Sequence, residues 1–244
     1  MRWLVLSLCA VVVLVGLGGL GLQRGWWRLT HPDRSRFPVW GVDVSHHQGS
    51  IDWPAVASEP HLAFAYIKAT EGGDWTDPRF EENWREARRA GFRVGAYHFF
   101  TFCRPPLDQA RHFLSILPRE AGLPREAGML PPAVDLEFGG NCRRTPDAPS
   151  LRAELSEWLH AVEDAIGSRP VIYVTAEAYD AFLDGSDLVE RYPIWIRDIW
   201  AEPRLPDGAR WAFWQFANRG RVRGIGTFVD LNVFAGSRES FGQL

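Results

Sequence analysis

Residues 132–137 read Pro132-Ala133-Val134-Asp135-Leu136-Glu137, an apolar run that ends in two carboxylates two positions apart. The composition predicts a buried strand, along which alternate side chains point to the same face, so Asp135 and Glu137 are expected side by side. Two adjacent acids at the end of a buried strand repel each other and resist ionisation, which raises at least one pKa. An enzyme that uses a protonated carboxyl as general acid beside a charged group needs two acids placed in this way.

An exposed acidic strand end would show the same pattern of carboxylates. Here Pro131-Pro132 precedes the run and Gly139-Gly140 follows it, which indicates a strand that leads into a loop. The flanking residues therefore favour a functional site over a solvated strand end.

Strand-like and helix-like segments alternate along most of the chain. The candidate strands are 39–44, 63–68, 93–99, 133–137, 170–175, 193–197, 211–216 and 228–231. Amphipathic stretches at 79–90, 107–117 and 150–167 indicate helices between them. Such alternation implies parallel strands with crossover helices. We predict a single α/β domain at 38–240, a TIM-like (β/α) barrel with some helices short or missing after the fifth strand.

The N-terminus forms a separate unit. Residues 3–22 carry no charge and are long enough to cross a bilayer as a helix. A cleaved signal peptide is the rival interpretation, but no small-x-small site stands out after the apolar run. We expect residues 1–22 to be a membrane anchor, 23–37 a linker, and the barrel to lie on the extracytoplasmic side, or to be secreted if the N-terminus is cleaved.

Composition narrows the classes of partner. The net charge of −3 and the absence of a basic run give no reason to expect nucleic acid. The 12 Trp and 15 Phe suit a cleft that stacks on sugar rings. His46 and His47 are adjacent, and no further His or Cys cluster joins them, so neither a metal nor another cofactor is expected. We expect a monomer.

Polar side chains stand at the carboxyl ends of the candidate strands, where barrels of this class build their active sites. In chain order these are Asp43, Lys68, His98, Asp135 with Glu137, Tyr173, Arg197 with Asp198, Gln215, and Asp230 with Asn232. His98 is expected as a hydrogen-bond partner in the cleft, and Glu71 as a substrate-site acid or an ion-pair partner of Lys68. Tyr97, Tyr173, Trp195 and Trp214 are expected to stack on sugars, although each taken singly is more often a core residue.

Two cysteines each follow a predicted strand end by a few residues. If these strands are adjacent, the loops carrying Cys103 and Cys142 leave the sheet on the same side. A disulfide between them is then geometrically reasonable in an oxidising compartment.

The residues at the strand ends also belong to ordered motifs. These are Gly41-Val42-Asp43-Val44-Ser45-His46-His47-Gln48-Gly49, Tyr66-Ile67-Lys68-Ala69-Thr70-Glu71-Gly72, Gly95-Ala96-Tyr97-His98-Phe99, Asp135-Leu136-Glu137, Trp214-Gln215 and Val229-Asp230-Leu231-Asn232. Together they resemble the motifs of the glycoside hydrolase family 25 lysozymes over roughly residues 39–236. The resemblance implies a β/α barrel that cleaves the β-1,4 bond between N-acetylmuramic acid and N-acetylglucosamine in peptidoglycan. Arg197-Asp198 departs from the less charged pair that similar chains often carry.

Glycoside hydrolysis requires a protonated carboxyl at the leaving oxygen and a second group that stabilises the oxocarbenium-like transition state. We assign the acid to Glu137, at the strand tip, with Asp135 charged or sharing a proton. The second group is either Asp43, or the substrate's own N-acetyl carbonyl with Asp135 orienting the amide. Both schemes predict retention. A glycan-binding barrel without turnover would lack the two acids, and a polysaccharide deacetylase would need paired His ligands that the sequence does not assemble.

Overall fold

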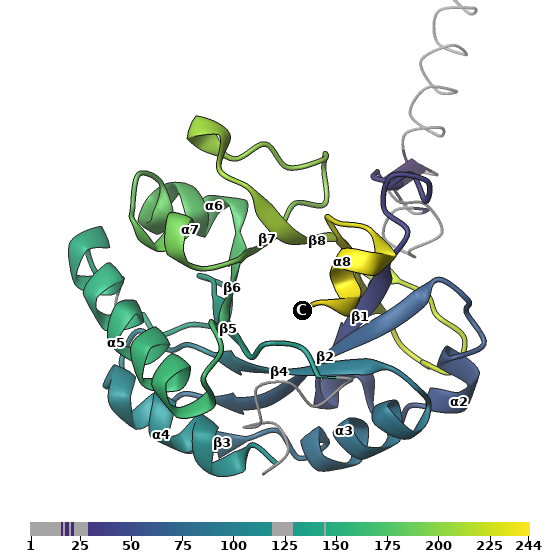
Figure 1. Cartoon of the computed structure of the whole chain (residues 1–244), viewed down its shortest axis with the longest axis horizontal. Helices are drawn as coiled ribbons and strands as arrows, with labels where there is room; N and C mark the ends of the chain where they lie inside the picture. The colour runs from purple at the N-terminus through teal and green to yellow at the C-terminus, as the bar shows by residue number, and fades with distance from the viewer. Residues whose placement is uncertain (1–15, 17, 20, 22–28, 119–128, 144) are drawn as a thin grey trace, which may run out of the picture.

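The computed structural model describes residues 16, 18–19, 21, 29–118, 129–143 and 145–244. Within that part of the chain, eight strands close into a barrel (Figure 1). They are β1 (Trp40–Val44), β2 (Leu62–Glu71), β4 (Arg93–Phe99), β5 (Ala133–Leu136), β6 (Val171–Thr175), β7 (Ile194–Arg197), β8 (Trp211–Gly220) and β9 (Val229–Phe234). The short strand β3 (Trp75–Thr76) pairs only with the end of β2. The predicted barrel is therefore confirmed.

Most of the expected membrane anchor, residues 1–22, lies outside the described residues, as does the first part of the linker at 23–37. Among the helices that the structure describes, none has both the length and the apolar character needed to cross a bilayer.

The last strand runs against its neighbours. β9 lies between β1 and β8 and is antiparallel to both, whereas β1, β2 and β4 to β8 pair in parallel. The prediction of parallel strands was wrong here because a parallel connection needs a dozen or more residues, and the chain from β8 to β9 spans only 221–228. Asp230 therefore lies near the start of β9, where it pairs in register with Asp43 of β1.

Three long helices cover the first half of the barrel and short ones the second. The long helices are α3 (Phe80–Arg89), α4 (Pro106–Ile116) and α5 (Ala148–Ile166). After β6 come α6 (Ala176–Ala178), η3 (Tyr179–Leu183), α7 (Leu188–Arg191) and η4 (Pro206–Gly208). The remaining short elements are η1 (His46–Gln48), α2 (Trp53–Val56) and α8 (Arg238–Gly242). The prediction that helices shorten after the fifth barrel strand is confirmed.

Large aromatic side chains fill the inside of the barrel. The Tyr66 ring lies 4.6 Å from that of Trp195, centroid to centroid, and Trp195 lies 4.8 Å from Tyr173. Tyr66 pairs in register with Gly95, where an added Cβ would come within 2.3 Å of the tyrosine ring, so only glycine fits beside it. Phe241 of α8 packs on this cluster from the end of the barrel that faces the viewer in Figure 1. The interior is therefore packed and closed at that end.

Candidate active site

A cavity of about 590 Å³ opens at the carboxyl ends of the parallel strands, a normal size for a ligand site. Its walls include eleven of the candidate residues: Asp43, Lys68, Glu71, Tyr97, Asp135, Glu137, Tyr173, Trp195, Arg197, Gln215 and Asp230. A larger hollow of about 750 Å³ lies beside α7 and η4, but no candidate residue lines it. The chemistry of the lining, and not the size of the hollow, therefore locates the candidate site, which we call the cleft.

His98 does not lie in the cleft, contrary to the prediction. Strand side chains alternate, so Tyr97 faces the cleft while His98 points outward, toward α4 and α5. Its ring stacks on Trp158, Nε2 donates to Gln109 Oε1 at 3.1 Å, and Nδ1 accepts from the Thr70 hydroxyl at 2.8 Å. Burial lowers the pKa of His98 to about 3, so the ring is neutral and structural.

Trp214 was also placed wrongly, for the same reason. Its neighbour Gln215 lines the cleft, so Trp214 faces the outer layer, where its ring packs on Phe37. The indole Nε1 donates to the carbonyl of Asp198 at 2.7 Å. Trp214 therefore holds the start of the loop after β7 and does not stack on a substrate in the cleft.

Asp43 is buried at the end of β1 and is held by two amides. Its Oδ2 accepts from Gln215 Nε2 at 3.0 Å and from Asn232 Nδ2 at 2.7 Å. Burial raises the pKa of Asp43 to about 6, although the two amide hydrogen bonds act in the opposite direction. The carboxyl is therefore fixed in place.

The interior aromatic residues set the direction of these amides. The Tyr173 hydroxyl donates to Gln215 Oε1 at 3.1 Å, and Trp195 Nε1 donates to Asn232 Oδ1 at 2.8 Å. An indole N–H can only donate, so the amide of Asn232 must turn its oxygen to Trp195 and its nitrogen to the acid. Tyr173 and Trp195 line the cleft, and their polar atoms serve to orient Asp43.

Asp230 completes this group from β9. A side-chain hydrogen bond joins it to Asp43, its partner in the strand register. Burial raises the pKa of Asp230 well above its usual range, and the charge of Asp43 raises it further. This hydrogen bond raises the pKa of Asp230 and lowers that of Asp43, so Asp230 is the carboxyl that holds its proton more readily.

Asp135 and Glu137 stand together at the end of β5, as the spacing predicts. Burial raises the pKa of Asp135 well above its usual range, and the charge of Glu137 adds to the effect. Burial also raises the pKa of Glu137, which is half-buried, while Arg197 acts against the rise. Asp135 Oδ1 is buried and has no hydrogen-bond partner among the described residues. Both acids therefore retain protons above the usual range for carboxyls.

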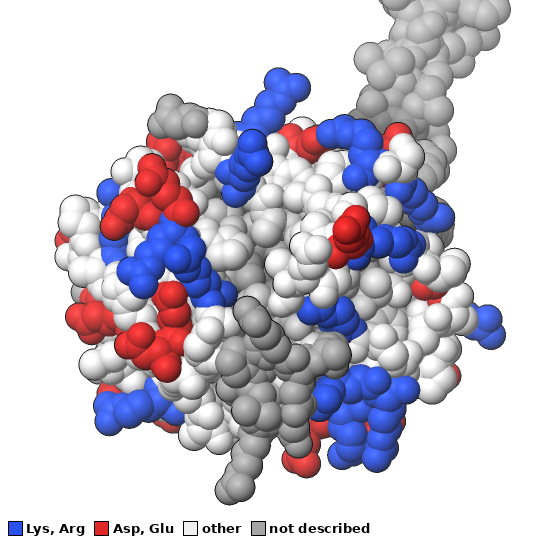
Figure 2. Space-filling view, in the orientation of Figure 1, with Lys and Arg blue, Asp and Glu red and all other residues white. Residues whose placement is uncertain are grey.

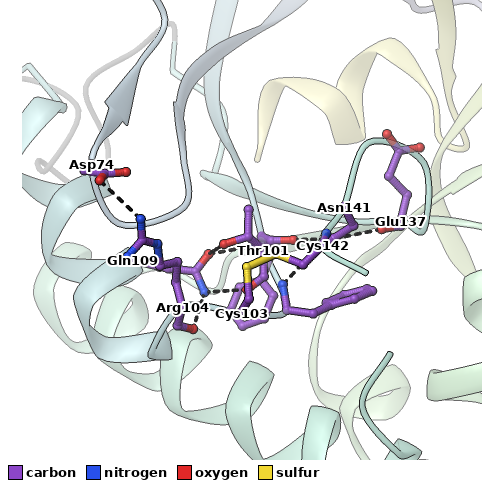
Figure 3. The surroundings of a disulfide bond; sticks show 10 residues. Asp74, Thr101, Cys103, Arg104, Gln109, Glu137, Asn141 and Cys142 are labelled. Carbon is purple, nitrogen blue, oxygen red and sulfur yellow. Dashed lines mark hydrogen bonds and ion pairs between the residues drawn. A yellow bond between two sulfur atoms is a disulfide. The ribbon is translucent and has the colours of Figure 1, made fainter. Parts of the chain in front are cut away.

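Asn141 and a disulfide secure the loop that follows Glu137. Asn141 Nδ2 donates to the carbonyls of Glu137 at 3.0 Å and Phe100 at 2.9 Å. A disulfide bond links Cys103 to Cys142, the residue after Asn141, with their Cα atoms 6.1 Å apart. The bond joins the loops after β4 and β5 (Figure 3). In this view the Glu137 side chain extends away from the bridge. The bridge and the amide together fix the backbone that presents Glu137.

Lys68, the only lysine in the chain, lies in the cleft as one partner of an ion pair. Its Nζ lies 2.7 Å from Glu71 Oε2 and 4.7 Å from the centre of the Phe99 ring. Glu71 was expected to be either a substrate-site acid or an ion-pair partner of Lys68, and the structure shows the ion pair. Both side chains also line the cleft.

Several residues of the cleft were not assigned a role from the sequence, among them Ser45, His47, Gln48 and Asn218. One signal was present: Ser45 and Gln48 have the spacing of a capping box, and they form one around η1. That turn places His47 at the cleft wall, while His46 Nδ1 lies 3.0 Å from Asp77 Oδ2. Within the described residues, no group of three or more His, Cys, Asp or Glu could hold a metal ion.

Comparison with known proteins places the chain in a family of glycosyl hydrolases. A family model described as glycosyl hydrolases family 25 matches residues 42–225. The chain is 38% identical to YegX of Escherichia coli (strain K12), over 83% of this chain and 72% of YegX. It is 36% identical to lysozyme M1 of Streptomyces globisporus, over 82% of this chain and 68% of that protein. A solved family 25 glycosyl hydrolase from Bacillus anthracis superposes with a TM-score of 0.79 at 36% identity, covering 89% of this chain and 97% of the other.

Proposed function

The chain belongs to glycosyl hydrolase family 25, and from this premise we propose that it cleaves glycan strands with retention, using Glu137 as the general acid. It is a peptidoglycan muramidase, which hydrolyses the β-1,4 bond between N-acetylmuramic acid and N-acetylglucosamine. The observation that carries the residue assignment is the pair of acids at the end of β5, Asp135 buried and Glu137 half-buried, whose pKa values are both raised.

Glu137 is the acid in this scheme because it is the more accessible of the two, at the tip of the strand. A carboxyl that holds its proton above the usual range can deliver it to the glycosidic oxygen as the bond breaks. Arg197 and Lys68 favour the charged form that Glu137 takes after the transfer.

For the second group, we propose the N-acetyl carbonyl of the substrate, oriented by Asp135. Asp135 Oδ1 is buried and has no partner among the described residues, so it is available to accept the amide N–H of a bound sugar. Asp43 is the alternative nucleophile, but its Oδ2 already accepts two amide hydrogen bonds. These bonds lower the nucleophilicity of that oxygen and suit Asp43 to an electrostatic role.

Digestion of purified peptidoglycan tests the reaction. The turbidity of a wall suspension should fall, and mass analysis of the reduced fragments should find new reducing ends on N-acetylmuramic acid. New reducing ends on N-acetylglucosamine would contradict the bond assignment. Loss of acetyl groups without chain cleavage would point to a deacetylase.

Retention is the expected stereochemical result, since either second group places a nucleophile on the sugar before water arrives. Inversion requires a second carboxylate that activates a water on the opposite face of the sugar ring from the acid, whereas Asp135 stands on the same strand face as Glu137. Proton NMR of the first product from a defined muramyl oligosaccharide should show the β-anomer before mutarotation. An initial α-anomer would contradict both nucleophilic schemes.

We also propose that residues 3–22 tether the enzyme to a membrane, with the barrel on the extracytoplasmic side. The support is the uncharged length of this segment and the substrate, which lies outside the cytoplasm. In fractionated cells, the full chain should stay with the membrane after a high-salt wash and should become accessible to protease added outside. A chain found in the medium with its N-terminus shortened would indicate cleavage and secretion.

A further inference from the structure

The end of β8 and the connection from it to β9 carry a concentrated positive charge. Residues 218–228 include Arg219, Arg221 and Arg223 but no acidic residue. All three arginines are exposed. On the face of the molecule shown in Figure 2, groups of basic and of acidic side chains both occur. Residues 218–228 carry positive charge alone, and we call this segment the arginine hairpin.

The arginine hairpin adjoins the cleft through both of its strands. Asn218, directly before Arg219, lines the cleft, and so does Asp230, two residues after Phe228. The guanidinium carbons of Arg219 and Arg221 lie 5.3 Å and 4.8 Å from the centre of the Phe228 ring. Two residues of strand span only about 7 Å, so this cationic group lies within one or two sugar lengths of the cleft wall.

The hairpin is anchored against the rest of the barrel, beside α2 (Figure 1). Gln48 Nε2 donates to the carbonyl of Phe228 at 3.0 Å, and the Asp52 amide donates to the carbonyl of Gly224 at 2.9 Å. A Cβ on Gly224 would lie 2.4 Å from the Asp52 carbonyl oxygen, so the approach is close. The backbone of the hairpin is therefore fixed, which lowers the entropic cost of binding.

The arginine hairpin and the lining of the cleft differ in charge. The cleft lining holds five acids, Asp43, Glu71, Asp135, Glu137 and Asp230, against two cations, Lys68, which is ion-paired with Glu71, and Arg197. The arginine hairpin holds cations alone, so an anionic group on a strand seated in the cleft is attracted to the hairpin more than to the lining. Guanidinium groups bind carboxylates in a planar, bidentate geometry.

We propose that the arginine hairpin binds free carboxylates on the peptide stems of the same glycan strand whose sugars occupy the cleft. The inference rests on the proposed function, because a muramidase is presented with a strand that bears such stems at intervals. The hairpin thereby selects strands with charged stems over strands whose stems are neutral. It touches no reacting atom, so its effect falls on KM and leaves kcat unchanged.

Two forms of one soluble glycan test this proposal: strands with intact peptide stems, and the same strands with the stem carboxylates converted to methylamides. At low ionic strength, KM should be about tenfold lower for the charged form, the combined scale of a few exposed ion pairs. Salt on the order of 0.5 M should remove most of this preference. The R219Q/R221Q/R223Q variant should lose the preference and keep its kcat on the neutral strands.

Two control variants separate charge from structure. R219K/R221K/R223K keeps the charge and should retain most of the preference. R85Q/R88Q/R89Q removes three arginines from the last two turns of α3, near the opposite end of the barrel, and should behave as wild type. A Gln triple that retains the tenfold preference, or that raises KM equally for both substrates, would overturn the inference. The inference would also be overturned if the Gln triple variant were impaired only on cell walls that carry phosphate polymers, because the arginines would then bind phosphate and not the stem carboxylates. If the wild type cleaves neither form, the proposed function itself fails.

Discussion

Glu137→Gln should lower kcat on peptidoglycan at least about a hundredfold, the usual scale of a general-acid contribution. The amide has nearly the same shape as the carboxyl, but it has no proton to give to the leaving oxygen. The backbone of residue 137 is held by Asn141 through its carbonyl, which the substitution leaves in place. The variant should therefore fold and bind glycan as the wild type does.

The choice of substrate makes this test sharper. A muramyl glycoside with a good aryl leaving group needs little protonation, so the Gln variant should cleave it at a rate much closer to that of the wild type. Glu81→Gln, an exposed acid on α3, provides the matched control and should cost nothing. A Glu137→Gln enzyme that digests peptidoglycan near the wild-type rate, or that is equally slow on both substrates, would show that the acid is another residue.

Asp135→Asn should also lower kcat by about a hundredfold or more, and it should stabilise the protein near neutral pH. The activity falls because the carboxyl of Asp135 can become negatively charged as the N-acetyl N–H gains positive charge during the reaction, and an amide cannot. The stability rises because burial and the charge of Glu137 raise the pKa of Asp135 well above its usual range in the folded protein. Ionising this acid therefore opposes folding.

The sign of the pH dependence follows from linkage. Below the usual aspartate pKa, about 4, the acid is protonated in both folded and unfolded chains, and the two proteins should have similar stability. As the pH rises from there toward the folded-state pKa, the unfolded wild type loses its proton first, so the wild type loses stability relative to Asp135→Asn. Thermal unfolding at pH 3 and pH 7 measures this difference. If the stability of the variant relative to wild type is the same at pH 3 and at pH 7, the proposed environment of Asp135 is contradicted.

The sequence could predict the features that depend on a repeating pattern of apolar and polar residues within one segment. The apolar run before Asp135 predicted both the strand and the shared face of the two acids, and Ser150 to Gly167 predicted most of α5. His98 and Trp214 were misplaced because the end of a strand can be located to within a residue or two, whereas one residue decides which face a side chain takes.

The contacts of Asp43 lie beyond any local pattern. Its two amide donors, Gln215 and Asn232, are 172 and 189 positions away along the chain. Nothing near Asp43 in the sequence indicates that these amides would be turned by Tyr173 and Trp195 to face it. The reversed direction of β9 escaped prediction for a related reason, because alternation alone does not show which way a strand runs.

The position of β9 determines when the enzyme can become active during its synthesis. This strand fills the gap between β1 and β8, so the first and last strands of the barrel must meet before the ring closes. A ribosome that has produced everything up to residue 228 has already made Glu137 and both cysteines of the disulfide, but not the strand that supplies Asp230 and Asn232. Contacts over such long separations also form late and slowly in folding. A growing chain that has not reached β9 therefore has no assembled site, and the capacity to cut a wall appears only once this strand has been made.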